Sequence, residues 1–283
     1  MTGVQTCALP ICGIDISSDE KYFLIKTSDH TTSEIYFFDV NKTNPKPKLF
    51  RKRQKEIEYS IDSWKEYFYI HTNLDAEDFK ICLCKIDNIE KWQDYIPATN
   101  GVLIGGFNLL NKWMIRSEVR DALAKLYVRN LDTNTEEELI ITDEKVISPG
   151  ASLMQKDRNT NKIYIAYQSP KTPGKAYIYN VLTKEKKLVK EEIVPSGHNP
   201  NDYVVQRLSC DSHDGKKIPL TITRHKNTQL DGSANLLLYA YGSYGNSMGP
   251  AFSSNILSLI NRNIIWVTAH VRGGMERGYN WWK

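Results

Sequence analysis

The dominant pattern along residues 13–192 is a succession of short runs in which hydrophobic and polar residues alternate. In the run KIYIAYQS, Ile163, Ile165 and Tyr167 fall on one face of an extended strand, and Tyr164 and Ala166 fall on the other. The turns between the runs, such as SSDE, LDTNTE and KDRNTNK, are rich in Asp, Asn, Ser and Thr, which favour tight turns. This part of the chain is therefore predicted to be all-β.

The predicted strands recur in pairs, each followed by a weaker third run such as EEELIIT or KKLVKEE. The pairs are KYFLIKTS with EIYFFDV, EYFYIHTN with FKICLCKI, KWMIRSEV with KLYVRNL, and KIYIAYQS with KAYIYNV. The aromatics that open the pairs, Tyr22, Tyr67, Trp113 and Tyr164, recur at roughly 45 to 50 residues, the period of a four-stranded propeller blade. We expect residues 13–192 to form a partial β-propeller of about four blades. A β-sandwich is the alternative, and the regular repeat makes it less favoured.

The pattern changes after residue 192. Residues 193–203, with two prolines and a glycine, are predicted to be a linker, and a β-hairpin that turns at Asp214-Gly215 is predicted to follow. Beyond the hairpin, NLLLYAY and IIWVTAHV are typical of buried strands, and AFSSNILSLINR between them has helical spacing. The apolar positions with that spacing are Phe252, Ile256, Leu259 and Ile260. A strand, a helix and a strand in succession predict the beginning of a parallel sheet, so residues 204–283 are interpreted as the start of an α/β domain.

Composition excludes several classes of function. The formal charge of the 283-residue chain is only +4, with basic and acidic residues interspersed, so no nucleic-acid partner is indicated. No apolar run approaches the roughly 18 residues of a membrane span, so no membrane partner is expected. Cys82 and Cys84 fall on one face of a strand without a second cysteine pair, which favours packing over a metal site and indicates a reducing, cytoplasmic location.

The first twelve residues, MTGVQTCALPIC, stand apart from this pattern. Their short apolar stretch is broken by Pro10, and no basic segment precedes it, which disfavours a signal peptide. The stretch is similar to the conceptual translation of a sequencing-library adaptor. We therefore expect residues 1–12 to be an artefact and the natural sequence to begin near Gly13.

Two motifs near the C-terminal end carry a family resemblance: LLLYAYGSYG, from Leu236 to Gly245, and HVRGGMERGYNWW, which starts at His270. Together they resemble the prolyl oligopeptidase family of serine peptidases, and within it most of all the oligopeptidase B branch. The stretches YIHTNLDAEDFK, YQSPKTPGKAYIYN and RLSCDSHDGKKIPLTI extend the resemblance over nearly all of the chain from Gly13 onward. It implies a seven-bladed propeller that acts as a lid over an α/β-hydrolase domain, admitting short peptides and excluding folded proteins.

The serine in the first motif does not have the surroundings of a hydrolase nucleophile. An α/β-hydrolase nucleophile lies on a G-x-S-x-G turn, whereas Tyr241 stands two residues before Ser243, and no other serine in the chain satisfies that pattern. None of the six histidines lies near a nucleophile motif, and His270 ends a buried-type strand. The resemblance implies that the catalytic serine, aspartate and histidine all come after Lys283, so the chain itself is predicted to be inactive.

The resemblance instead implies two other site residues. Tyr241 corresponds to the tyrosine whose neutral hydroxyl donates to the oxyanion in the family; its alternative role is to cap the strand and pack against the lid. Tyr244 falls where related enzymes place an aromatic side chain against the substrate residue before the scissile bond; its alternative is ordinary packing. Arg272 and Glu276, four residues apart around a glycine turn, are predicted to form an internal salt bridge. Met275 departs from the family, which usually has a small residue there.

The sequence thus favours part of a serine endopeptidase that cleaves short peptides by acyl transfer, without metal or organic cofactor. Similarity to oligopeptidase B implies cleavage after Lys or Arg, and cleavage after Pro is the near alternative. A catalytically inactive propeller that binds peptides remains open. The sequence leaves the oligomeric state undetermined. An unclosed propeller and an incomplete sheet expose strand edges, so the isolated chain is predicted to fold poorly.

Overall fold

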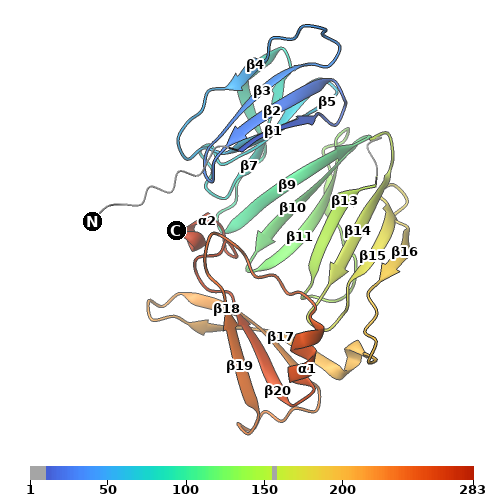
Figure 1. Cartoon of the computed structure of the whole chain (residues 1–283), viewed down its shortest axis with the longest axis vertical. Coiled ribbons are helices and arrows are strands. Elements are labelled where there is room, and N and C mark those ends of the chain that lie inside the picture. The colour runs from blue at the N-terminus through green and yellow to red at the C-terminus, as the bar shows by residue number, and fades with distance from the viewer. Residues whose placement is uncertain (1–10, 155–157) are drawn as a thin grey trace. The chain divides into compact units, whose positions relative to one another are not determined.

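The computed structural model describes residues 11–154 and 158–283, so most of the proposed artefact at residues 1–12 lies outside the described residues. Over the described residues the chain forms five four-stranded sheets (Figure 1). The chain divides into two compact units. The first comprises Met1–Thr99, Leu109–Asn111 and Lys156–Arg158, as far as these residues are described, and the second comprises the rest of the chain.

The first unit holds two antiparallel sheets, in the orders β1-β2-β3-β4 and β5-β6-β7-β8. Their strands are β1 (Ile11–Ile16), β2 (Tyr22–Ser28), β3 (Ser33–Asp39), β4 (Lys48–Arg51), β5 (Tyr59–Trp64), β6 (Tyr67–Thr72), β7 (Lys80–Lys85) and β8 (Asn88–Ile96). In each sheet, strands that are neighbours in sequence are also neighbours in space, because short polar turns connect them as hairpins.

Aromatic side chains join these two sheets. Phe68 of β6 is fully buried, and its ring lies 5.2 Å from Phe37 and 5.1 Å from Phe50, both edge-on. Edge-to-face contacts of this kind contribute about 0.5–1.5 kcal/mol beyond the area they bury. Tyr59 of β5 adds hydrogen bonds between the sheets: its hydroxyl accepts the Ile35 N–H at 2.9 Å and donates to the Arg51 carbonyl at 2.7 Å. The aromatic positions therefore pack one sheet onto the next.

The second unit contains most of two further antiparallel sheets, in the orders β12-β11-β10-β9 and β13-β14-β15-β16. Their strands are β9 (Val102–Leu110), β10 (Trp113–Arg120), β11 (Leu123–Asn130), β12 (Glu136–Glu138), β13 (Ser148–Leu153), β14 (Lys162–Gln168), β15 (Lys175–Asn180) and β16 (Lys186–Glu191). The indole N–H of Trp113 donates to the Asn161 side-chain oxygen at 3.0 Å, which ties the third sheet to the turn before β14.

All eight strands of the predicted pairs are present, and the predicted repeat of four-stranded antiparallel sheets is confirmed. The sequence pattern missed the strand that opens each sheet. In β13 the reason is visible, because Pro149 and Gly150 interrupt the run. Proline is tolerated there because, in the described part of the chain, β13 is an edge strand that pairs only with β14.

The fifth sheet is mixed and has the order β17-β18-β20-β19. After a short 3-10 helix, η1 (Pro200–Asp202), strands β17 (Tyr203–Asp211) and β18 (Lys217–His225) form the predicted hairpin, in which Gly215 has a φ of 76°. β19 (Asn235–Ala240) and β20 (Ile264–Ala269) are parallel neighbours, as predicted, and α1 (Ser254–Ile260) connects them. The chain ends with α2 (Tyr279–Trp282).

Ser253 caps the start of helix α1, and its hydroxyl accepts the Ile256 N–H at 3.5 Å. Its buried residues are Leu257 and Ile260, which pack with Tyr203 of β17. The predicted helical face was therefore only partly right. Phe252 lies before the helix, and Leu257 rather than Leu259 is buried.

Candidate functional site

Tyr241 follows the last residue of β19, at the carboxyl end of the two parallel strands. β19 is an edge strand, so nothing pairs with its outer side in the described part of the chain. The Tyr241 side chain is 37% exposed, and among residues 11–154 and 158–283 its hydroxyl has no hydrogen-bond partner. Tyr241 therefore presents a free donor where parallel strands commonly place their ligands.

The two motifs that follow β19 and β20 pack against each other through glycines. A Cβ atom on Gly242 would overlap the Arg272 carbonyl oxygen, and one on Gly273 would overlap the Gly242 backbone. The Gly245 N–H also donates to the Gly273 carbonyl at 2.9 Å. Only glycine permits this backbone approach, which fixes the position of the peptide bond just after Tyr241.

Tyr244 lies on the same loop but turns away from the protein. Its φ is 57°, in the left-handed region that non-glycine residues seldom adopt, and its side chain is 82% exposed. The ordinary packing that was the alternative to substrate contact is thus not seen within the described residues. The Ser243 carbonyl accepts the Asn246 N–H at 3.1 Å, which closes the turn. In the same described part of the chain, the Ser243 hydroxyl has no histidine partner, so this turn does not form a nucleophile-base pair.

The predicted salt bridge between Arg272 and Glu276 is wrong. Arg272 forms an ion pair with Asp214 at the tip of the β17–β18 hairpin, and its guanidinium also lies 3.4 Å from the Ser212 hydroxyl. This partner lowers the pKa of Asp214 to about 2. The glycine turn points the two side chains of the motif in different directions, so that Arg272 reaches solvent and Glu276 does not.

Glu276 is fully buried instead. Its Oε1 atom accepts the backbone N–H of Met248 at 2.9 Å, and within the described residues Oε2 has no hydrogen-bond partner. Burial raises the pKa of this carboxyl group. Gly274 leaves space for the carboxylate, because a Cβ there would overlap Oε2.

The turn between β10 and β11 contacts the same region. The Ala122 N–H donates to the Glu276 carbonyl at 2.8 Å. The Asp121 carboxylate pairs with Nε of Arg277 at 2.8 Å, and the Asp121 carbonyl accepts a hydrogen bond from Arg207 of β17. The turn therefore holds the glycine-rich segment through both backbone and side-chain contacts.

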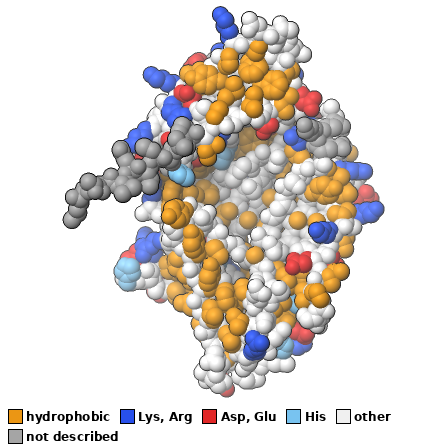
Figure 2. Space-filling view, viewed as in Figure 1, with side chains coloured by type: hydrophobic (Ala, Val, Ile, Leu, Met, Phe, Trp, Pro, Cys, Tyr) orange, Lys and Arg blue, Asp and Glu red, His pale blue; other side chains and the backbone are white. Residues whose placement is uncertain are grey.

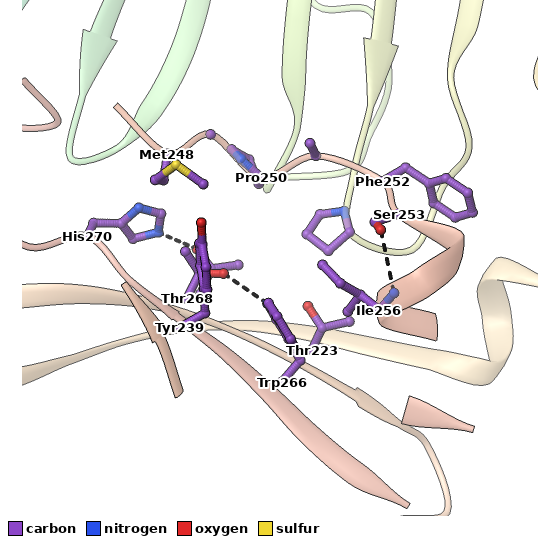
Figure 3. Close-up of a pocket in the computed structure, with 14 residues that line it drawn as sticks. Thr223, Tyr239, Met248, Pro250, Phe252, Ser253, Ile256, Trp266, Thr268 and His270 are labelled. Atoms are coloured by element: carbon purple, nitrogen blue, oxygen red, sulfur yellow. Dashed lines mark hydrogen bonds between the residues drawn. The ribbon is translucent and has the colours of Figure 1, made fainter. Parts of the chain in front are cut away.

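A pocket of about 300 Å³ lies on the face of the fifth sheet that carries Tyr239 and Trp266 (Figure 3). Met248 and Pro250, from the segment before α1, lie across the pocket from these two side chains, and Phe252 of the same segment also lines it. Its polar groups are the hydroxyls of Thr221, Thr223, Thr268, Ser253 and Tyr239, and the imidazole of His270. Neither Tyr241 nor Tyr244 lines this pocket, so the sequence-predicted site residues lie outside it.

His270 is fully buried beside the pocket, and its Nε2 atom lies 2.7 Å from the Thr221 hydroxyl. This is the spacing of a nucleophile and its base, but two observations argue against that chemistry. Burial, with a contribution from the Arg207 guanidinium, lowers the pKa of His270 to about 4, which makes it a weak base at neutral pH. Arg207 also donates to the same Thr221 oxygen at 2.8 Å. The pair is therefore structural.

Sequence reasoning missed the partners of both motif side chains. Asp214 was recognised as a turn residue of the hairpin, but its distance of 58 residues from Arg272 hid their contact. The contact between Glu276 and Met248 uses a backbone N–H, which no sequence pattern marks.

Over residues 11–154 and 158–283, no group of three or more His, Cys, Asp or Glu side chains lies close enough together to hold a metal ion. No helix in these residues is long and apolar enough to cross a membrane.

Comparison with known proteins shows similarity along nearly the whole chain. The model of the prolyl oligopeptidase N-terminal β-propeller domain matches residues 8–192. The chain is 33% identical over 277 residues to dipeptidyl aminopeptidase BI of Pseudoxanthomonas mexicana, and 26% identical over 270 residues to protease 2 of Moraxella lacunata. Both alignments cover 95% of this chain, but only 37% and 39% of the respective relatives.

A solved structure agrees with these alignments. Oligopeptidase B from Trypanosoma brucei, in a closed form with covalently bound antipain, matches with a TM-score of 0.89 and 29% sequence identity. The match covers 97% of this chain and 40% of that structure. The chain thus spans about two fifths of the length of the proteins it resembles.

Proposed function

This chain belongs to the prolyl oligopeptidase family, and on that premise we propose that it is part of a longer serine peptidase that hydrolyses short peptides. The family match and the share of 37–40% that it spans of its relatives support this proposal. Three further blades and the catalytic serine, aspartate and histidine would then lie outside residues 1–283. The four sheets described here would form the corresponding part of a propeller that admits peptides and excludes folded proteins.

We propose that residues 204–283 are the start of an α/β-hydrolase domain. The order β17-β18-β20-β19, with an antiparallel hairpin followed by a parallel pair and a helical crossover, supports this assignment. In open α/β sheets, ligands bind outside the carboxyl ends of the parallel strands. The loops after β19 and β20 meet at that end.

The observation that carries the proposal is the position of Tyr241 on this loop. Its hydroxyl has no hydrogen-bond partner within the described residues, and the Gly242–Gly273 contact fixes the backbone beside it. A neutral phenol that donates to the developing oxyanion lowers the barrier for acyl transfer by on the order of 3 kcal/mol. Tyr241 would be one of two donors, and the other would be supplied by the part of the protein that carries the serine.

Tyr244 is proposed to contact the substrate residue before the scissile bond. Its side chain is almost wholly exposed on the same loop, three residues after Tyr241. Residues in such sparsely populated backbone conformations cluster at ligand-binding sites, which supports a substrate contact for Tyr244. The peptide chain would lie across the loop, with its carbonyl toward Tyr241 and the preceding side chain against Tyr244.

The residue preference is proposed to be Lys or Arg before the scissile bond. The 29% identical structure is an oligopeptidase B, which supports this preference over cleavage after proline. Another relative, at 33% identity, is named a dipeptidyl aminopeptidase, which makes release of dipeptides from a free N-terminus the second candidate. The acidic side chains that would read a basic residue are expected outside this chain.

The proposal is tested with the complete protein that contains this sequence. Matched fluorogenic peptides that end in Arg or in Pro, each with a blocked or a free N-terminus, are assayed before and after treatment with a serine-directed phosphonate. We expect cleavage of the blocked Arg peptide, and its loss once the phosphonate has bound covalently.

Other outcomes correct particular parts of the proposal. Cleavage after Pro would overturn the proposed basic preference, and cleavage only of peptides with a free N-terminus would favour a dipeptidyl peptidase. Neither labelling nor turnover of any peptide would contradict the peptidase assignment and favour a propeller that only binds peptides.

A further inference from the structure

Glu276 is a buried carboxylate, and the contacts around it do not compensate for the free energy that its burial costs. It is fully buried, and in the described part of the chain only one of its two oxygens has a hydrogen-bond partner. An ionised group in such a place destabilises a protein unless its hydrogen bonds and ion pairs compensate, and an apolar side chain of the same volume would often be tolerated better. What the carboxylate provides, and an apolar side chain would not, is an acceptor for the Met248 N–H.

That hydrogen bond is one of several contacts along the loop that carries Tyr241. Gly242 closely approaches Arg272 and Gly273, and the Gly245 N–H donates a hydrogen bond to the Gly273 carbonyl. These two contacts join backbone to backbone. The hydrogen bond from the Met248 N–H to Glu276 instead joins the loop backbone to a side chain.

The Glu276 carboxylate also contacts the glycine-rich loop that follows β20. Its Oε2 atom lies directly against Gly274, and the backbone of Gly274 forms a bridge with Gly245. The Glu276 carbonyl in turn accepts the Ala122 N–H of the β10–β11 turn at 2.8 Å. Glu276 is thus held by the third sheet through its backbone, and its side chain contacts both glycine loops.

We propose that Glu276 is a positioning residue that holds the loop from Tyr241 to Met248 in the conformation that presents the Tyr241 hydroxyl to the reacting carbonyl. This inference rests on the proposed function of Tyr241 as an oxyanion donor. Glu276 itself does not touch the substrate. Its effect on the reaction passes through the Met248 N–H and the backbone of Gly274 to the loop.

A double-mutant cycle in the complete protein tests the proposal, because a residue that acts through Tyr241 has no effect once the Tyr241 hydroxyl is gone. We expect Tyr241→Phe to lower kcat about 100-fold with little change in KM. Glu276→Ala should lower kcat about tenfold or more in the wild-type background, and by less than about twofold in the Tyr241→Phe background. A second variant, Gly274→Ala, adds a methyl group that would overlap both the carboxylate and the Asn246 carbonyl of the same loop, and it should behave in the same way.

Two controls separate positioning from general destabilisation. Leu257→Ala creates a cavity under α1 and should lower Tm while leaving kcat of the folded enzyme unchanged. Gly106→Ala adds a methyl group in open space and should change neither. If Glu276→Ala cannot be purified, the cycle is completed with Gly274→Ala.

The outcomes distinguish the inference from the proposed function beneath it. Equal losses of kcat for Glu276→Ala, or for Gly274→Ala, in both backgrounds would overturn the positioning role, and so would a rise in KM with kcat unchanged. An unchanged kcat in Tyr241→Phe alone would overturn the proposed donor instead.

Discussion

Arg272 forms an ion pair with Asp214, 58 residues earlier in the chain, and not with Glu276, four residues later. The pair joins the tip of the β17–β18 hairpin to the glycine loop after β20. Arg272 and Glu276 of the glycine-rich motif were predicted to pair with each other, but each contacts a different part of the fold instead. One charge holds the hairpin, and the other supports the loop that carries Tyr241.

The Asp214 ion pair predicts a specific pH dependence of stability. Arg272 lowers the pKa of Asp214 from 3.8 to about 2, so the carboxylate is more acidic in the folded protein than in the unfolded chain. It therefore stabilises the fold above about pH 4, and this contribution is lost as the pH falls through about 2. Urea unfolding of Asp214→Asn at pH 2 to 5 should give a shallower decline in the free energy of unfolding than that of the wild type. Parallel curves for the two proteins would contradict the pairing.

His270 predicts a second loss of stability on acidification, at higher pH than that of Asp214. Its pKa is lowered to about 4 by burial, below the usual 6.5, so the folded state keeps it neutral while the unfolded chain binds a proton. The free energy of unfolding should consequently fall by up to about 3 kcal/mol as the pH drops from about 6.5 to 4. His270→Gln should remove most of this slope. Proton NMR titration of the imidazole gives an independent check, and a pKa near 6.5 would show that the ring is not buried as described.

Gly242 tests the contact between the two loops. An alanine Cβ at this position would overlap the Arg272 carbonyl, so Gly242→Ala should cost about 1–3 kcal/mol of stability and displace Tyr241. We expect kcat to fall more than Tm alone explains. Gly106→Ala is the matched control, because nothing lies within 4 Å of its added methyl group. If both variants retain the stability and kcat of the wild type, the close approach of the loops is not present in solution.

The exposed edge strand β19 predicts how the 283-residue chain behaves by itself. All six of its residues are exposed, and Leu238 is 62% exposed on a strand with no neighbour on its outer side in the described residues. Figure 2 shows hydrophobic side chains on the surface around this strand. Such an edge recruits further strands, so the isolated chain should self-associate, and Leu238→Lys should reduce that association. Analytical ultracentrifugation of the wild-type chain and of Leu238→Lys measures how far each one associates. A wild-type chain that is monomeric and unfolds cooperatively would contradict this prediction.

The strand pattern was predictable because it depends on short-range alternation. The eight strands of the predicted pairs and the parallel pair of β19 and β20 all follow from local periodicity and turn residues. The first strand of each of the four antiparallel sheets could not be predicted from local periodicity. β13 contains Pro149 and Gly150, and β9 contains Gly105 and Gly106, so their strand character comes from pairing with a neighbour and not from their own propensity.

The residues of the candidate site could be predicted only where they belong to a motif that carries the family resemblance. Tyr241 and Tyr244 came from the resemblance, and the structure leaves both side chains exposed on one loop. The contacts that hold this loop were not predictable, because they use backbone groups and glycines whose approach depends on the whole fold. Glu276 illustrates this: its spacing from Arg272 suggested a local pair, whereas burial and the Met248 N–H determine its actual position.

The most direct test of the central claim is a crystal structure of the complete protein with a peptidyl phosphonate bound to its catalytic serine. The tetrahedral adduct places an oxygen where the oxyanion forms. We predict that the Tyr241 hydroxyl lies about 2.7–3.1 Å from that oxygen, as a donor to it. A Tyr241 side chain that points away from the adduct, with other groups occupying the donor positions, would contradict the proposed role of the loop after β19.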